Sequence, residues 1–289
     1  MKLLRVLGWI VLVLVLLAFA LIADIYFAGR PHQGRAQYVA MGSSFASGPA
    51  ISERAADSPW FCGRSRDNYA HQLARLRGLE LVDVTCGGAT AQHILGGGQL
   101  LQPAQIAAVR PDTELVTVTI GGNDIGYMAN LLAMGCDANT PRVQRAIGGC
   151  RVRSTAEMEQ ALMKVQSQLA MIVDEVHRRA PHARVVLVNY PTVLPATGSC
   201  DRLGLTAEQA DQMRGIAAKL ADTTRAAAQA HGALLLDAAT LTRAHDVCAA
   251  DPWMNGMHPE RGLLGAPLHP TLAGMTAVAD ALNALLDGR

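Results

Sequence analysis

The sequence predicts an α/β fold: a three-layer α/β/α sandwich with a five-stranded parallel sheet, preceded by an N-terminal hydrophobic helix. Five short, mostly apolar segments have the composition of strands that are buried on both faces. Helical patterns separate these segments, and strands that alternate with helices pair in parallel. Half of the 289 residues are hydrophobic and 17% are charged, so the chain can build one sizeable core.

Each predicted strand is a short apolar run. The first, QYVAM over residues 37–41, stops at Gly42, and the third, LVTVTI over residues 115–120, stops at Gly121 and Gly122. The other predicted strands are 79–85 (LELVDVT), 184–189 (RVVLVN) and 233–237 (ALLLD).

Capping patterns mark the starts of the two longest predicted helices. Ser154 with Glu157, and Thr206 with Gln209, have the spacing at which two side chains bond the free N–H groups of a helix start. The first of these helices stops at Pro181. The second runs to about residue 231, and shorter helical patterns cover 66–77 and 271–286.

The N-terminus forms a separate segment. Lys2 and Arg5 precede an uncharged apolar stretch over residues 6–23, and a membrane-spanning helix needs roughly 17–25 such residues. We favour an uncleaved signal-anchor over a cleaved signal peptide, although Ala18-Phe19-Ala20 has the form of a cleavage site. The leading positive charges predict that this end stays in the cytoplasm, with the remaining chain outside.

These features divide the chain into a signal-anchor or signal peptide (1–29), a linker (30–36) and one domain (37–289). We expect an exported protein, anchored facing outside or secreted if the signal is cleaved. With 25 Lys and Arg against 24 Asp and Glu, no long basic run and 4% aromatic residues, nucleic acid is not an expected partner.

The six cysteines agree with export, because an even number on an exported chain is typical of disulfides. Six cysteines allow 15 pairings. Sequential pairing is the simplest, and its middle bridge would contribute about 3 kcal/mol on a chain-entropy basis. That pairing joins Cys62 to Cys86, Cys136 to Cys150 and Cys200 to Cys248. The sequence lacks a C-x-x-C pair and a zinc-finger histidine spacing, so we expect no metal and no cofactor.

Residues capable of chemistry follow three strands and precede the last helix. Ligands bind at the carboxyl ends of parallel strands, so these segments are expected to meet there. Each alone is a weak indication, since glycine, serine and asparagine also make turns. The segments are GSSFASG from Gly42, CGGAT from Cys86, GGND from Gly121 and LHP from Leu268.

Together the four segments resemble the blocks of the SGNH hydrolase family, the GDSL-type lipases and esterases, over residues 37–285. The resemblance implies a flavodoxin-like fold and a Ser44 nucleophile with His269 as general base. It implies an oxyanion hole from the N–H groups of Ser44 and Gly88 and the side chain of Asn123. The cysteine placement is similar to the secreted, three-disulfide branch of the family, which supports sequential pairing.

Two positions depart from the family pattern. Ser43 stands where the family usually has Asp, which is outside the family's catalytic machinery. Ala266 stands where members with a triad carry an Asp three residues before the histidine. A backbone carbonyl is therefore our preferred partner for His269, with Asp251 as the alternative acid. His258-Pro259 is a second His-Pro pair, but no T-x-A-G pattern follows it.

The resemblance implies hydrolysis of carboxylic esters, of lipids or the cell envelope, through a Ser44 acyl-enzyme. We expect a monomer that takes a small-molecule or lipid ester and meets the membrane through its N-terminal helix. The alternatives are a catalytically inactive surface-binding module with the same fold, which the missing acid would favour, and an acyltransferase variant.

Overall fold

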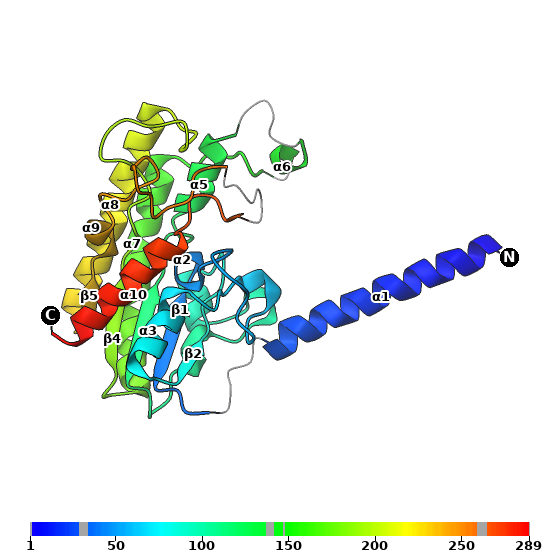
Figure 1. The fold of residues 1–289 in the computed structure, drawn as a ribbon, viewed down its shortest axis with the longest axis horizontal. Coiled ribbons are helices and arrows are strands. Elements are labelled where there is room, and N and C mark those ends of the chain that lie inside the picture. Colours follow the sequence, from blue (N-terminus) through cyan, green and yellow to red (C-terminus); the bar gives the residue numbers. More distant parts are fainter. Residues whose placement is uncertain (1, 29–33, 137–141, 147, 259–264, 289) are drawn as a thin grey trace.

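A five-stranded parallel sheet forms the centre of the domain, as predicted (Figure 1). The computed structural model describes residues 2–28, 34–136, 142–146, 148–258 and 265–288. The strands lie in the order β2-β1-β3-β4-β5, so the chain builds outward in both directions from β1. Their bounds are Tyr38–Gly42 (β1), Leu81–Asp83 (β2), Leu115–Thr119 (β3), Arg184–Val188 (β4) and Leu234–Leu236 (β5).

Helices cover both faces of this sheet. Successive strand residues point to opposite sides, so Val39 and Met41 enter one core while Tyr38 and Ala40 enter the other. The first core packs under α4, α5, α7 and α8, and the second under α3 and α10. The helices are α1 (Lys2–Ala28), α2 (Ser44–Ser47), α3 (Tyr69–Arg77), α4 (Ala91–Leu95), α5 (Tyr127–Met134), α6 (Arg142–Ala146), α7 (Thr155–Arg179), α8 (Ala207–Ala230), α9 (Ala238–Leu241) and α10 (Leu272–Leu286). Short 3-10 turns are η1 (Trp60–Cys62), η2 (Gln99–Leu101) and η3 (Gln105–Ala108).

The capping predictions for α7 and α8 are confirmed, since both capping boxes form. The prediction for α3 placed its start three residues too early. The helix begins at Tyr69 because the Asn68 side chain accepts a hydrogen bond from the backbone N–H of His71. Strand β2 is also shorter than predicted, because the Asp83 carboxylate accepts the N–H of Thr85 and turns the chain.

Three disulfides stabilise the connections, and their pairing is the sequential one. They join Cys62 to Cys86, Cys136 to Cys150 and Cys200 to Cys248. The first ties η1 to the loop after β2, which lies at the carboxyl edge of the sheet.

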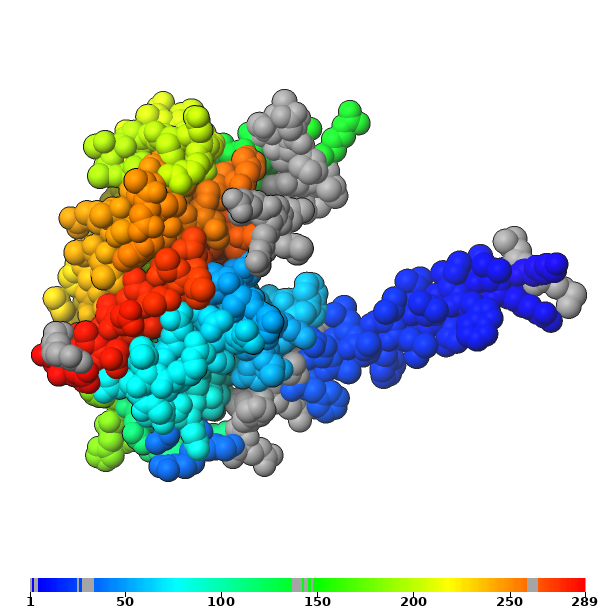
Figure 2. Space-filling view, in the orientation of Figure 1, coloured from blue at the N-terminus to red at the C-terminus, as the bar shows by residue number. Residues whose placement is uncertain are grey.

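Helix α1 stands clear of the domain as a long rod (Figures 1 and 2). Its 20-residue stretch Arg5–Asp24 is long and apolar enough to cross a membrane, and none of it is buried. At its carboxyl end Asp24 accepts hydrogen bonds from the Arg54 guanidinium (3.4 Å) and the backbone N–H of Trp60 (3.2 Å). The end of α1 therefore lies against the loops that precede α3.

Candidate active site

The sharp turn from β1 into α2 places Ser44 at the carboxyl edge of the sheet. Gly42 has φ +142°, and a Cβ there would lie 2.4 Å from the carbonyl oxygen of Thr119, so only glycine fits. The N–H of Ser43 then donates to that same carbonyl at 2.9 Å. Ser44 becomes the first residue of α2, with 8% of its surface exposed.

The hydroxyl of Ser44 meets the imidazole of His269. Ser44 Oγ lies 2.7 Å from Nε2, across 225 positions of sequence. On the other side of the ring, Nδ1 lies 2.7 Å from the carbonyl oxygen of Pro267. A carbonyl can only accept, so Nδ1 carries the proton and Nε2 is free to accept from the serine hydroxyl. This is the tautomer that a general base requires.

A strained loop presents the imidazole. Ala266 and Leu268 have φ +47° and +58°, which is unusual for residues with a side chain. Asn255 stabilises the loop, because its N–H donates to the His269 carbonyl and its side-chain amide donates to the Gly265 carbonyl. The ring of Phe45 lies 4.9 Å from that of His269, centroid to centroid.

Asp251 is not the partner of His269. Its carboxylate lies 3.4 Å from Nδ1 of His245, and its backbone carbonyl lies 2.8 Å from the same nitrogen. The Pro267 carbonyl occupies the position that an orienting acid would take. The second candidate base, His258, is exposed on the surface.

The three predicted oxyanion donors surround the same sheet edge. Within the described residues, no acceptor is found for the backbone N–H of Ser44 or for that of Gly88. Asn123, in the loop after β3, donates one amide hydrogen to the carbonyl of Ala89 at 2.9 Å. That bond fixes the carboxamide beside Gly88 and leaves its second hydrogen available.

Four contacts immobilise the Gly88 loop. Cys86 donates its N–H to the Gly42 carbonyl at 3.0 Å and is bonded to Cys62. The N–H of Gly87 donates to the Cys62 carbonyl at 2.9 Å, and the Gln99 side chain donates to the Gly87 carbonyl at 2.6 Å. The donor on Gly88 is therefore fixed before a substrate arrives.

Tyr190, which sequence analysis did not single out, connects two of these loops. Its hydroxyl lies 2.9 Å from Ser43 Oγ and accepts the N–H of Gly122 at 3.0 Å. Burial raises the pKa of Tyr190 to about 12, so it stays protonated. Ser43 is thus the partner of Tyr190 at the position where the family usually has Asp. The available signal was the place of Tyr190, two residues after the end of β4, at the edge where ligands bind.

Replacing Tyr190 with phenylalanine is expected to lower kcat about tenfold with little change in KM. The change leaves Ser43 Oγ and the Gly122 N–H without their partner, at a cost of about 1–3 kcal/mol in unfolding free energy. Urea unfolding and steady-state kinetics check both effects. Tyr38→Phe is the matched control, because Tyr38 is also buried but its hydroxyl bonds Thr117 within the sheet. It should lose stability and keep kcat; equal kinetic losses would contradict a positioning role for Tyr190.

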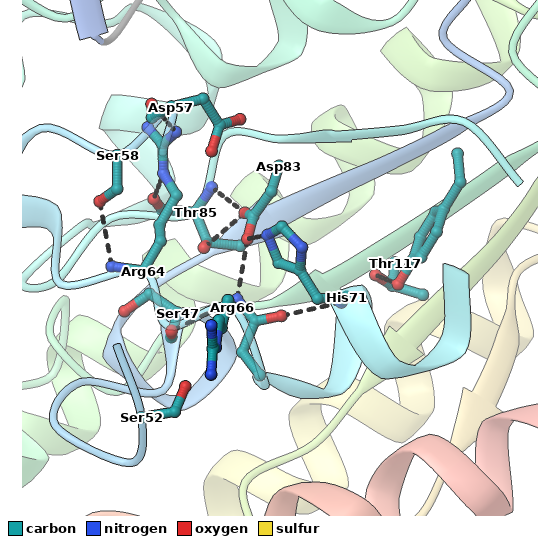
Figure 3. Close-up of polar contacts among 12 residues, drawn as sticks. Ser47, Ser52, Asp57, Ser58, Arg64, Arg66, His71, Asp83, Thr85 and Thr117 are labelled. Carbon is teal, nitrogen blue, oxygen red and sulfur yellow. Dashed lines mark hydrogen bonds and ion pairs between the residues drawn. The ribbon is translucent and has the colours of Figure 1, made fainter. Parts of the chain in front are cut away.

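Two carboxylates, the half-buried Asp124 and the buried Asp83, bond the segments that surround the site. Asp124 accepts the N–H of Ala91 at the start of α4, and burial raises its pKa to about 6. Asp83, at the end of β2, is surrounded by Thr85 and His71 (Figure 3). Burial raises the pKa of Asp83, but the hydrogen bond from His71 and the nearby Arg64 charge outweigh it and keep that pKa below its usual value.

Asp83 is linked to α2, the helix of Ser44, through the side chain of Asn68. Asn68 Nδ2 lies 2.8 Å from Asp83 Oδ2 and 3.3 Å from the Ser47 carbonyl in α2. The Thr85 hydroxyl donates to the other carboxylate oxygen at 2.7 Å. The same carboxylate therefore positions both the helix of Ser44 and the segment that leads to Gly88.

The acid limb of the pH profile is expected to lie below pH 6.5. Burial lowers the pKa of His269 from its ordinary value of 6.5, against the opposing hydrogen bond to the Pro267 carbonyl. The neutral, active form therefore persists at lower pH than for a free imidazole. Measuring kcat/KM on a soluble ester between pH 4 and 8 checks this. Asp124→Asn removes a carboxylate whose pKa of about 6 falls in the same range, and should leave the midpoint below 6.5; a midpoint above it would contradict the assignment.

A cleft of about 640 Å³ opens beside the loop of His269. Ile51, Met254 and Leu272 line it, and Met254 pairs with Pro270 next to the imidazole. The α5 residues that follow the GGND segment do not line this cleft: Tyr127, Met128 and Leu131 are buried in the core. Among the described residues, no group of three His, Cys, Asp or Glu side chains is arranged to hold a metal.

The sequence model described as "GDSL-like Lipase/Acylhydrolase family" matches residues 40–277, which contain Ser44, Gly88, Asn123 and His269. The chain belongs to the GDSL-like lipase/acylhydrolase family. It is 32% identical to Lipase 2 of Streptomyces coelicolor over 251 residues, 84% of this chain and 83% of that protein. The fold and the family together make it a carboxylic ester hydrolase.

Solved structures of family members have the same fold. A phospholipase A1 from Streptomyces albidoflavus superposes with a TM-score of 0.71 at 26% identity, covering 87% of this chain and 99% of that one. An extracellular lipase from Streptomyces rimosus gives a TM-score of 0.70, also at 26% identity, and covers 86% and 99%. The chain therefore covers nearly the whole length of both structures.

Proposed function

We propose that this protein is a serine lipase that cleaves carboxylic esters of lipids through an acyl-enzyme on Ser44. The observation that carries the proposal is the contact of 2.7 Å between Ser44 Oγ and His269 Nε2, with Nδ1 on the Pro267 carbonyl. A serine hydroxyl is a weak nucleophile unless a base accepts its proton within hydrogen-bond reach. The pair meets that requirement without an acidic residue.

The first step forms the acyl-enzyme. Ser44 Oγ attacks the ester carbonyl carbon while its proton passes to His269 Nε2. The carbonyl π electrons move to oxygen, and the N–H groups of Ser44 and Gly88 and the Asn123 amide stabilise that oxyanion. When the carbon–oxygen bond to the alcohol breaks, Nε2 returns the proton to the departing oxygen.

The second step repeats the sequence with water. A water molecule gives its proton to Nε2 as its oxygen attacks the acyl carbon. Collapse of the second oxyanion breaks the bond to Ser44 Oγ, and the imidazolium protonates that oxygen. The products are a carboxylic acid and the free serine. Throughout, the Pro267 carbonyl stabilises the imidazolium through Nδ1–H, which is the role an aspartate has in a triad.

Lipid esters fit the surroundings of the dyad. The cleft beside the loop of His269 has the aliphatic side chains of Ile51, Met254 and Leu272 in its lining, together with polar ones such as Asp201 and Arg202. Relatives of this chain are named lipases, and one solved neighbour is a phospholipase A1. The three disulfides and the apolar α1 accord with export, and we propose that α1 stays as an anchor with the domain outside the cell.

A fluorophosphonate probe tests the proposed nucleophile. The oxidised protein should form one covalent adduct, which peptide mass spectrometry places on Ser44, and Ser44→Ala should abolish it. Ser47→Ala is the matched control: Ser47 lies in the same short helix, is buried, and its hydroxyl has no partner among the described residues. It should label normally. An unlabelled, folded protein would instead support the inactive binding module.

A further inference from the structure

Three large apolar side chains are exposed where α1 meets the domain. Trp60 in η1 is 57% exposed, and Leu100 and Leu101 in η2 are 56% and 71% exposed. We call these three residues the apolar rim. Single exposed leucines are common on soluble proteins, but a group of this kind marks a binding surface when something on the molecule says what covers it.

The end of α1 supplies that second observation. Asp24 accepts the N–H of Trp60 at 3.2 Å, and η2 also contacts α1. The next exposed residues of α1 are aromatic, Tyr26 and Phe27 at 47% and 70%. Tyrosine and tryptophan concentrate where a spanning helix leaves the hydrocarbon for the headgroups. In a bilayer crossed by α1, Trp60 and the neighbouring η2 would lie at the depth of this end of the helix.

The backbone holds the two leucines in an unfavourable conformation. Leu100 and Leu101 have φ +45° and +66°, and two successive leucines in the left-handed region are rare. Their turn is closed by the N–H of Gly98 donating to the Gln102 carbonyl at 3.0 Å. Since the strained leucines are also exposed, packing within the domain does not account for them. An apolar medium outside the domain does.

The rim is joined to the oxyanion loop. Gln99 immediately precedes the two leucines, and its side-chain amide donates to the Gly87 carbonyl at 2.6 Å. Gly87 is followed by Gly88, whose N–H we place in the oxyanion hole. A surface that covers Leu100 and Leu101 therefore lies next to the catalytic edge of the sheet.

We propose that the apolar rim rests in the outer surface of the lipid bilayer that α1 crosses. Docking turns the carboxyl edge of the sheet, which carries Ser44, toward the bilayer that supplies the lipid ester substrate. This inference deepens the proposed lipase function and rests on it. The anchor alone would tether the domain at any orientation, whereas Trp60, Leu100 and Leu101 select one.

Trp60 is a built-in probe for this contact. The full chain carrying Trp9→Phe, which removes the tryptophan inside α1, is reconstituted into phosphatidylcholine vesicles with and without dibrominated acyl chains. Bromine should quench the Trp60 emission. The same protein with Trp60→Phe leaves Trp253, which stacks on His245 at 3.6 Å, and should show no quenching. If bromine leaves the Trp60 emission unchanged, the proposal is overturned. That result is expected when a second copy of the chain, and not lipid, covers the rim.

Activity on two substrates tests the consequence. Leu100→Gln with Leu101→Gln should slow hydrolysis of a vesicle-borne phospholipid at least about tenfold. The double variant removes two leucine side chains that the bilayer would bury. Turnover of soluble p-nitrophenyl acetate should stay within about twofold, since neither leucine contacts the ester. Leu76→Gln is the matched control: it is also 56% exposed but lies at the end of α3, at the opposite edge of the sheet.

The outcomes separate the two proposals. Equal losses on both substrates would show that the leucines only support the oxyanion loop, and would overturn the docking surface. Equal losses in the Leu76→Gln control would do the same. Bromine quenching of Trp60 in a protein that hydrolyses neither substrate would support the docking surface and reject the proposed lipase function.

Discussion

His269→Ala is expected to reduce kcat/KM for a soluble ester by on the order of 10⁴- to 10⁶-fold, with little change in KM. In the proposed mechanism the imidazole accepts the serine proton and later protonates both leaving oxygens, so its loss would remove base and acid together. Its Nε2 lies 2.7 Å from Ser44 Oγ, and we assign it no direct contact with bound substrate, so KM should change little. Steady-state kinetics on p-nitrophenyl esters measure the effect.

Two further variants make this experiment decisive. His258→Ala removes the second histidine that precedes a proline, is exposed, and should retain activity. The double variant Ser44→Ala/His269→Ala should be no slower than either single variant, because residues that act as one unit are strongly non-additive. Retention of more than about one hundredth of the activity in His269→Ala would remove it from the proposed chemistry.

Asn123→Ala is expected to lower kcat by about 10²–10³-fold, the usual loss for one oxyanion donor. The amide is held toward Gly88 by its bond to the Ala89 carbonyl, so the donor needs no reorganisation when charge develops on the substrate oxygen. KM should change little because the interaction strengthens only in the transition state. Kinetics on the same ester series measure the loss.

The control for Asn123 is a change of chemistry at constant shape. Asn123→Asp keeps the size of the side chain and replaces donors with acceptors, so its loss in kcat should be at least as large. Thermal unfolding should show both variants folded, because the side chain lies in a loop after β3. Full activity in Asn123→Ala would place the third donor elsewhere.

The sheet and the long helices could be predicted because their signals are local. The apolar run at residues 115–120 forms a strand wherever it is buried, and Ser154 with Glu157 caps α7 through contacts three residues apart. The resemblance to the family's blocks predicted which of these segments meet at the site. The C-terminal ends of elements were less predictable. Strand β2 ends at Asp83 because its carboxylate accepts the N–H of Thr85 in the turn that follows.

The missed parts of the site depend on contacts between distant residues. Tyr190 acquires its position only when β4 lies beside β3 and its hydroxyl reaches Ser43 and Gly122. For His269 the preferred partner was already a backbone carbonyl, but the sequence did not say which one; the Pro267 carbonyl reaches Nδ1 in a loop where Leu268 has a positive φ. Composition gives no sign of such a backbone conformation. Asp251 was a reasonable alternative by residue type, but the fold gives it to His245.

The bridge between Cys62 and Cys86 has a consequence for the cell that makes this enzyme. The bridge ends two residues before Gly88 and fixes the segment that positions it. Thiols remain reduced in the cytoplasm and pair only after translocation. Under the proposed export, a newly made chain would therefore lack the fixed Gly88 segment inside the cell and would become active only after the bridge forms on the outer side of the membrane.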